Sequence, residues 1–290
     1  MEIVRRKKPD WLKIKIENNP EFAFVKRVVE DNNLHTICSS GKCPHMNECW
    51  NRGTATFMIL GDICTRSCKF CATKSGRPLE IDKNEAVKLA RSVKLMSLKH
   101  CVITSVDRDD LPDGGVGHWV ECVEQIREMN PNTTIELLLP DFDAKESLLE
   151  IAVSCGADIF GHNIETVESV TPQVRSRASY AKSMAVLSYF ASKGLLVKSG
   201  LMVGVGESDE EVHQTLRDLY ANGCRIVTIG QYLQPTKKHL EVDRYVEPEI
   251  FETYRVWAEE IGFKSVFSSP LVRSSYLADL AVNIDKKKIL

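Results

Sequence analysis

The chain has 290 residues, which suits one large domain or two modest ones, and its 43% hydrophobic and 27% charged residues are typical of a soluble globular protein. A formal net charge of -2 gives no electrostatic basis for binding nucleic acid. No apolar run reaches the ~20 residues of a membrane span, and Met1–Lys15 lacks the apolar core of a signal peptide. We therefore expect a cytoplasmic protein without a membrane partner, in which ten cysteines indicate metal binding rather than disulfides.

Strand-like and helix-like runs alternate from Thr56 onward. Short apolar runs predict six strands, at Thr56–Leu60, Cys101–Ser105, Thr134–Leu139, Ile159–His162, Leu195–Leu201 and Arg225–Ile229. Longer amphipathic runs predict a helix after each strand, at Ile81–Met96, Gly117–Met129, Ala144–Cys155, Ser179–Lys193, Ser208–Asn222 and Glu247–Ile261.

Residues near the ends of these runs predict where several helices begin and end. Asp82, with Glu85 three residues later, matches a capping box. Gly156 and Gly194 follow helical runs and can end them. Ser208 is expected to cap the helix that it precedes.

Six strand–helix units in series predict an α/β fold with a parallel sheet and helical crossovers. The crossovers can wind the sheet into an open doubly wound fold or a barrel, and the pattern alone does not choose between them. In both folds the chemistry lies at the carboxyl ends of the strands. The polar residues expected at these ends are Thr104, Ser105, His162, Asn163, Gln231 and Gln234.

Three cysteines with the spacing CxxxCxxC, Cys64, Cys68 and Cys71, follow the first predicted strand. Soft thiolates at short spacing in a loop suit an iron–sulfur cluster. Three thiolates can bind three irons of a 4Fe–4S cube and leave the fourth iron open, as a catalytic metal requires. The alternative is a structural zinc site, which needs four protein ligands where this loop offers three.

A second triplet, Cys38, Cys43 and Cys49, has the spacing CxxxxCxxxxxC. A zinc knuckle with His45 as fourth ligand competes with a cluster here, and the first triplet close by favours the cluster. The remaining cysteines are isolated in apolar surroundings and are expected in the core; they are Cys101, Cys122, Cys155 and Cys224.

The CxxxCxxC loop, with Phe70 before its last cysteine and a series of six βα units after it, resembles the radical S-adenosylmethionine (SAM) superfamily. The resemblance implies a partial (βα)6 barrel of the TIM type. It also implies a SAM molecule whose methionyl amine and carboxylate chelate the open iron. Gly200–Glu207 resembles the superfamily segment that lies along the adenine, although a glycine-rich turn before a helix is common.

Within the superfamily, motifs along nearly the whole chain resemble the lipoyl synthase family. They are Lys8–Leu12, the second triplet followed by Trp50, Ile103–Gly115, His162–Val167, Gln231–Thr236 and Arg273–Tyr276. In that family the second serine of the last motif ligates the fourth iron of an auxiliary 4Fe–4S cluster, which maps onto Ser275. A hard serinate oxygen is a poor match for iron in such a cluster. A weak ligand of this kind suits a cluster that is dismantled during the reaction.

One segment departs from the family form. Val170–Arg177 is shorter and less basic than the family would have it. This leaves open whether Arg175 or Arg177, if either, meets the SAM carboxylate or the substrate.

The resemblance places the SAM-binding residues around the strand ends. They are Thr104 and Ser105 near the methionyl part, Asn163 and Glu165 at the ribose and polar end, Gly206 and Glu207 beside the adenine, and Phe70 and Arg175 elsewhere in the site.

The resemblance also implies the reaction. A low-potential donor of the flavodoxin or ferredoxin type reduces the first cluster, which cleaves SAM to a 5′-deoxyadenosyl radical. The radical abstracts hydrogen from C6 of an octanoyl chain on a lysine of a carrier domain, a sulfide of the second cluster traps the carbon, and a second SAM repeats the step at C8. The implied carriers are the glycine-cleavage H protein or a 2-oxoacid dehydrogenase E2, and an Fe–S cluster carrier is the implied partner for the cluster that is consumed.

Other functions stay open on the residues alone. Another sulfur-inserting radical SAM enzyme, such as a biotin synthase or a methylthiotransferase, is disfavoured by the motif Arg273–Tyr276 and by the N-terminal position of the second triplet. An electron carrier with two clusters rarely needs six βα units. A zinc-stabilised interaction protein is the remaining alternative.

The chain is expected to be one integrated domain in three parts. Residues 1–53 form an N-terminal extension that carries the second triplet, residues 54–232 the partial barrel, and residues 233–290 a C-terminal extension with the motif Arg273–Tyr276.

Overall fold

The computed structural model describes residues 7–14 and 19–281, so the outermost parts of both predicted extensions lie outside the described residues. One eight-stranded sheet runs in the order β1-β2-β5-β6-β7-β8-β9-β10. Its strands are β1 (His35–Thr36), β2 (Thr56–Ile59), β5 (His100–Ser105), β6 (Thr134–Leu138), β7 (Ile159–Gly161), β8 (Leu196–Val203), β9 (Ile226–Gln231) and β10 (Ser265–Ser268).

The sheet curves into a barrel that does not close, which confirms the predicted α/β partial barrel. All neighbouring strands from β2 to β10 are parallel, and only β1 is antiparallel to its neighbour β2. The strand order starts at β1 and ends at β10, so these two edges do not pair with each other.

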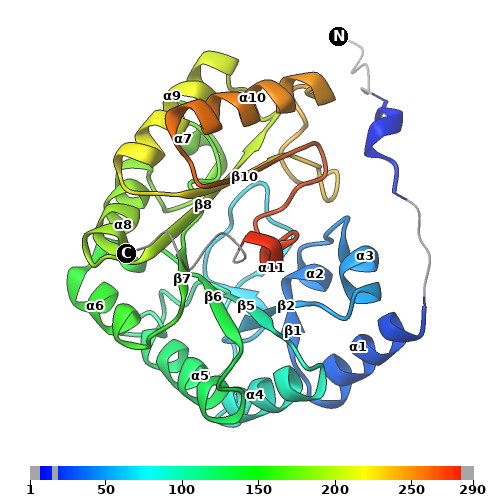
Figure 1. Ribbon diagram of the computed structural model, residues 1–290, viewed down its shortest axis with the longest axis vertical. Coiled ribbons are helices and arrows are strands. Elements are labelled where there is room, and N and C mark those ends of the chain that lie inside the picture. The colour runs from blue at the N-terminus through cyan, green and yellow to red at the C-terminus, as the bar shows by residue number, and fades with distance from the viewer. Residues whose placement is uncertain (1–6, 15–18, 282–290) are drawn as a thin grey trace.

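The long crossover helices lie outside the parallel strands in Figure 1, as parallel strands joined by helical crossovers require. The helices are α1 (Pro20–Asp31), α2 (Ile37–Ser40), α3 (Met46–Asn51), α4 (Glu85–Leu95), α5 (Val116–Met129), α6 (Glu146–Ser154), α7 (Thr171–Val174), α8 (Tyr180–Ser192), α9 (Asp209–Ala221), α10 (Pro248–Ile261) and α11 (Ala278–Ala281). Two further strands, β3 (Ile63–Cys64) and β4 (Lys74–Ser75), pair in the loop after β2.

The core lies between the strands and the apolar faces of these helices. Trp119 of α5, Phe190 of α8 and Phe251 of α10 are fully buried there. The predicted core position of the isolated cysteines is confirmed for Cys101, Cys122 and Cys224, whereas Cys155 is half-buried. In the described part of the chain, no helix has the length and hydrophobicity to cross a membrane.

The predicted strands and helices are found within a few residues of their expected ends, but the capping box is wrong. Helix α4 begins at Glu85 with Asn84 as its N-cap. The buried Glu85 carboxylate accepts the Leu60 N–H at 2.9 Å and lies 2.7 Å from His118 Nε2. Asp82 accepts the Asn84 N–H instead. The local pattern predicted that the Glu85 carboxylate would cap the helix. It is bonded to Leu60 and His118 instead, which are distant in the sequence.

The two extensions contribute edge strands that the sequence did not predict. β10 lies parallel to β9, with α10 as the crossover, and thus adds a seventh parallel strand. Its four residues, Ser265–Ser268, are too few and too mixed in polarity to stand out as a strand pattern. β1 contains only two residues.

Replacing Glu85 with alanine tests the contact between α4, α5 and the end of β2. The Leu60 N–H and the His118 ring would lose their buried acceptor, and we expect a loss of about 2–3 kcal/mol of unfolding free energy. Urea unfolding measures it. The matched control is Glu121→Ala, because the largely exposed Glu121 contacts the other nitrogen of His118 and should contribute less than about 1 kcal/mol. Equal losses would contradict this account.

Candidate active site

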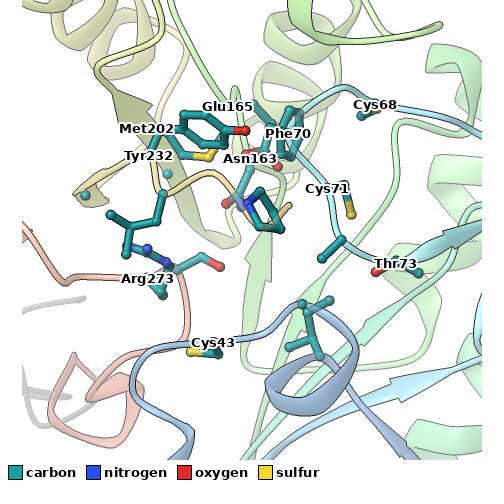
Figure 2. A pocket seen from close by; sticks show the side chains of 18 of the residues that line it. Cys43, Cys68, Phe70, Cys71, Thr73, Asn163, Glu165, Met202, Tyr232 and Arg273 are labelled. Carbon is teal, nitrogen blue, oxygen red and sulfur yellow. The ribbon is translucent and has the colours of Figure 1, made fainter. Parts of the chain in front are cut away.

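A cavity of about 570 Å³ opens at the carboxyl ends of the strands, a volume in the range of small-molecule sites. Figure 2 shows Cys68 and Cys71 on one side of this cavity and Cys43 and Arg273 on another. The expected site residues that line it are Cys43, Cys64, Cys68, Phe70, Cys71, Thr104, Ser105, Asn163, Glu165 and Arg175.

Hydrogen bonds from several parts of the barrel fix the first cysteine triplet. The Gly76 N–H donates to the Cys64 carbonyl at 2.9 Å, beside the short β3–β4 pair. The Lys69 N–H donates to the Val174 carbonyl at 2.9 Å. His239 Nε2 donates to the Cys71 carbonyl at 2.9 Å. Two of these supports, Val174 and His239, lie more than a hundred positions further along the chain than the groups they bond.

Arg66, inside the CxxxCxxC loop, is buried against three carboxylates. Its guanidinium donates to both oxygens of Asp109 at 2.9 Å and to both oxygens of Asp141 at 2.8 and 2.9 Å. Asp107 lies 3.3 Å away. Burial opposes the charge on Asp141, yet Arg66 outweighs burial and lowers the pKa of that carboxyl. Paired guanidinium–carboxylate contacts of this kind hold a fixed orientation, so Arg66 joins the loop to the ends of β5 and β6.

The thiols of this triplet face hydrogen-bond donors. Cys64 Sγ accepts the N–H groups of Arg66 at 3.4 Å and of Asp107 at 3.3 Å. Burial, together with the Asp107 carboxylate, raises the pKa of Cys64 to about 12. A metal bound here would therefore displace a proton, as thiolate ligation requires.

The arrangement of the first triplet is compatible with a cluster. Cys68 and Cys71 are close enough for their charges to interact, as are Cys64 and Cys71. Yet among the described residues, no three His, Cys, Asp or Glu side chains converge on one metal ion. A cube needs no such convergence, because each thiolate binds a different iron.

Ser105 and Arg175 line the cavity, and Arg175 Nη1 donates to the Asn163 carbonyl at 3.3 Å and to Ser183 Oγ at 2.9 Å. Ser105 Oγ and Arg175 Nε are buried without a hydrogen-bond partner in the described part of the chain, and such groups call for a ligand. Thr104 Oγ1 already donates to the Leu138 carbonyl. Arg177 is half-exposed and lies 3.7 Å from Asp109. Of the two arginines left open by the sequence, Arg175 is thus the one that reaches the cavity.

Glu165 has an uncommon backbone conformation beside the cavity. Its φ of 71° lies in the left-handed region, which a non-glycine residue adopts only when its surroundings require it. Backbone bonds to β8, from Glu165 N–H to the Gly200 carbonyl and from Met202 N–H to the Glu165 carbonyl, hold it there. Burial raises the pKa of its carboxyl, which accepts a hydrogen bond from Asn163. Figure 2 shows both side chains next to Phe70.

Gly206 and Glu207, expected beside the adenine, do not line the cavity. The buried Glu207 carboxylate accepts the N–H groups of Gly204 and Val205 and closes the turn after β8. Gly200, Leu201 and Met202 of β8 form the wall in their place. Part of the expected segment therefore lines the cavity, whereas the side chain of Glu207 serves the turn.

The second triplet gathers where the two extensions meet. The pKa of Cys43 is raised to about 11 and that of Cys49 to about 12. Burial is the main cause for both thiols, and the neighbouring Cys38 is the second. Thr56 Oγ1 donates to Ser275 Oγ at 2.8 Å, and Thr56 also hydrogen-bonds with Cys38. Cys49 and Ser275 line one small pocket. The structure thus brings Ser275 to the second triplet across more than two hundred residues.

His45, the alternative zinc ligand, has neither ring nitrogen free. Nε2 donates to the Leu271 carbonyl at 2.5 Å, and Nδ1 lies 2.9 Å from Glu48. The ring stacks on Tyr276 with a centroid distance of 3.8 Å, and Tyr276 also donates to Glu48 at 2.9 Å. His45 therefore holds the C-terminal segment against the second triplet, and it does not complete a zinc site.

The fold and the three-cysteine loop define a radical SAM enzyme, and comparisons with known proteins agree. The family model described as "Radical SAM superfamily" matches residues 58–219. Members of this superfamily use a 4Fe–4S cluster and SAM. The chain is similar to the lipoyl synthase of Phocaeicola vulgatus, with 53% identity over 94% of this chain and 96% of the relative. It is 54% identical to the lipoyl synthase of Bacteroides thetaiotaomicron, over 95% of this chain and 98% of the relative. The chain belongs to the lipoyl synthase family.

Solved structures are similar at the level of the fold alone. Methylornithine synthase aligns with a TM-score of 0.56 and 17% identity, over 72% of this chain and 69% of that chain. SuiB of Streptococcus suis, bound to S-adenosylmethionine, aligns with a TM-score of 0.58 and 12% identity, over 77% and 53%.

Replacing Arg66 with methionine tests the support of the first triplet. Breaking a buried ion pair costs about 3–5 kcal/mol, so we expect a large loss of stability in urea and a lower iron content after reconstitution. Because the pKa of Asp141 is lowered, the stability that this pair contributes is lost as the pH falls through that pKa. The difference between the two proteins should therefore shrink in acid. Arg127→Met is the control, since Arg127 pairs with the one-third-exposed Asp158 outside the cavity.

Replacing His45 with phenylalanine tests the hold on the C-terminal segment. The ring can still stack on Tyr276, but the donor to Leu271 is lost. Loss of a hydrogen bond of about 1 kcal/mol should let the segment move away more readily. We therefore expect a roughly fivefold faster transfer of iron from the second triplet to a chelator. The control is His213→Phe, because His213 stacks on Trp257 in the same way, between α9 and α10. An unchanged rate would show that His45 does not hold the segment.

Proposed function

We propose that the chain inserts sulfur at C6 and C8 of an octanoyl group that is amide-linked to a lysine of a carrier domain. Lipoyl synthesis of this kind is the activity of the family to which the chain belongs. The observation that carries the residue assignment is that residues from three separate parts of the chain meet. Cys43 lines the cavity together with the first triplet, and Cys49 lines a small pocket with Ser275 beside Thr56, the first residue of β2.

Cys64, Cys68 and Cys71 are the residues that would hold the SAM-binding cluster, with one iron left open for the methionyl amine and carboxylate. A reduced cluster bound there supplies the electron that cleaves SAM to a 5′-deoxyadenosyl radical. The donors to Cys64 Sγ and the burial of the loop are the means by which this chain adjusts the cluster's potential.

The chain's own residues orient SAM and the octanoyl chain. Ser105 and Arg175 line the cavity and are the residues proposed for the polar groups of SAM, and Asn163 with Glu165 offers a polar pair for its ribose. Hydrogen abstraction from an unactivated carbon needs no acid or base, so position and the exclusion of water are what the protein contributes. A rigid barrel suits that demand.

Cys38, Cys43, Cys49 and Ser275 are the residues that would hold the auxiliary 4Fe–4S cluster. A cluster bound there supplies the sulfur atoms. Cys43 and Arg273 line the same cavity as the first triplet, which supports a substrate carbon placed between the two clusters.

The proposed partners follow from this chemistry. The substrate is an octanoylated carrier, either the glycine-cleavage H protein or a 2-oxoacid dehydrogenase E2. A flavodoxin or ferredoxin is the proposed reductant, and an Fe–S cluster carrier the proposed source of a new auxiliary cluster, in the cytoplasm. The division into an extension at 1–53, a barrel at 54–232 and an extension at 233–290 also stays a proposal.

Cysteine variants of the two triplets separate the two roles. The reconstituted chain should contain about eight irons, and alanine at Cys43 or at Cys68 should lower this to about four. With SAM, dithionite and an octanoyl-lysyl peptide, mass spectrometry should show two hydrogens replaced by two sulfurs for the wild type. Cys43→Ala should still form 5′-deoxyadenosine without inserting sulfur, and Cys68→Ala should form neither product.

Cys155→Ala is the matched control and should keep both the iron and the product, since Cys155 is half-buried at the C-terminal end of α6 and belongs to neither triplet. Sulfur insertion by the Cys43→Ala protein would contradict the role of the second triplet. Deoxyadenosine with an unchanged peptide in the wild type would contradict the proposed substrate.

A further inference from the structure

The segment Thr171–Arg177 packs on the first cysteine triplet. Its carbonyl at Val174 accepts the Lys69 N–H at 2.9 Å. Its Ser176 hydroxyl accepts the Ser67 N–H at 3.2 Å. Two backbone groups between Cys64 and Cys71 are therefore bonded to this one segment.

The Ser176 hydroxyl also faces a cysteine of the triplet. Ser176 Oγ lies 3.7 Å from Cys68 Sγ, within reach of a hydrogen bond to sulfur, and in the free thiol either atom can be the donor. An iron-bound thiolate has no proton and can only accept. The Ser67 N–H already occupies a lone pair of the Ser176 oxygen, which leaves the hydroxyl hydrogen free to point at the sulfur.

We propose that Ser176 donates a hydrogen bond to the Cys68 thiolate and thereby raises the reduction potential of the SAM-binding cluster. The inference rests on the proposed function, because it takes Cys68 as a ligand of that cluster. Reduction adds negative charge to the cluster and its sulfurs, so a donor stabilises the reduced form more than the oxidised form. Hydrogen bonds to sulfur are among the factors that set the potentials of such clusters.

Ser176 differs from the other donors to these thiols because it is a side-chain donor from outside the cysteine loop. Cys64 receives two backbone N–H groups, which no side-chain substitution removes. Cys71 is hydrogen-bonded by Thr73, which belongs to the same loop. Ser176 comes from the unit after β7, and the same segment places Arg175 at the cavity. One segment would therefore contribute to both SAM binding and the ease of reduction.

The test is a redox titration of the full chain, reconstituted with iron and sulfide and followed by electron paramagnetic resonance with SAM present. The change in signal on adding SAM identifies the SAM-binding cluster beside the auxiliary one. For Ser176→Ala we expect wild-type iron content and a more negative midpoint, with a roughly tenfold weaker reduction equilibrium, which is about 59 mV for one electron.

Two further variants serve as controls. Ser176→Thr keeps the hydroxyl and should have a midpoint close to that of the wild type. Ser169→Ala removes a serine hydroxyl that is bonded to Glu211, away from the triplet, and should also leave the midpoint unchanged.

An unchanged midpoint in Ser176→Ala would overturn the inference. Loss of the cluster's iron in Ser176→Ala, but not in Ser176→Thr, would also overturn it, since the hydroxyl would then serve assembly and not reducibility. A wild-type protein that contains iron but whose signal does not respond to SAM would instead contradict the proposed function itself.

Discussion

The barrel stops short of closing, and the surroundings of the cavity depend on how the two chain ends fill the remaining gap. β1 and β10 form the free edges. The C-terminal segment leaves β10, bonds to β9 through Gln231 N–H and the Pro270 carbonyl, and reaches β2 at Thr56 and Ser275. It passes so close to β9 that a side chain at Gly230 would meet the Val272 carbonyl at 2.0 Å. Glycine at this position is what lets the segment cross the open side.

This crossing brings Ser275, one proposed ligand of the auxiliary cluster, next to cysteines from the other end of the chain. In the open barrel, the N-terminal helices α2 and α3 and the crossing segment occupy the gap together, joined by His45 and Tyr276. Cys43 and Arg273 can then face the same cavity as the first triplet.

The sequence predicted what depends on local pattern, and it missed what depends on distant contacts. The strand–helix series was visible because each strand is a continuous apolar run, and the cysteine spacings were visible as such. The three carboxylate partners of Arg66 and the contacts of Glu85 could not be read from spacing, since each joins separate units of the barrel. Ser275 became a candidate cluster ligand only through the family resemblance, because a polar turn near the C-terminus carries no signal of its own.

The two triplets are held by interactions of different strength, and the difference agrees with their proposed roles. Arg66 fixes the first triplet through a buried guanidinium with two fully paired carboxylates, whose disruption costs several kcal/mol. Ser275 is held by single hydrogen bonds and one ring stack, each contributing about 1 kcal/mol. A cluster that cleaves SAM repeatedly must keep its ligands in place through every turnover. A cluster that gives up its sulfur must lose iron and be rebuilt, which is easier when one ligand sits on a segment that can move away without unfolding the barrel.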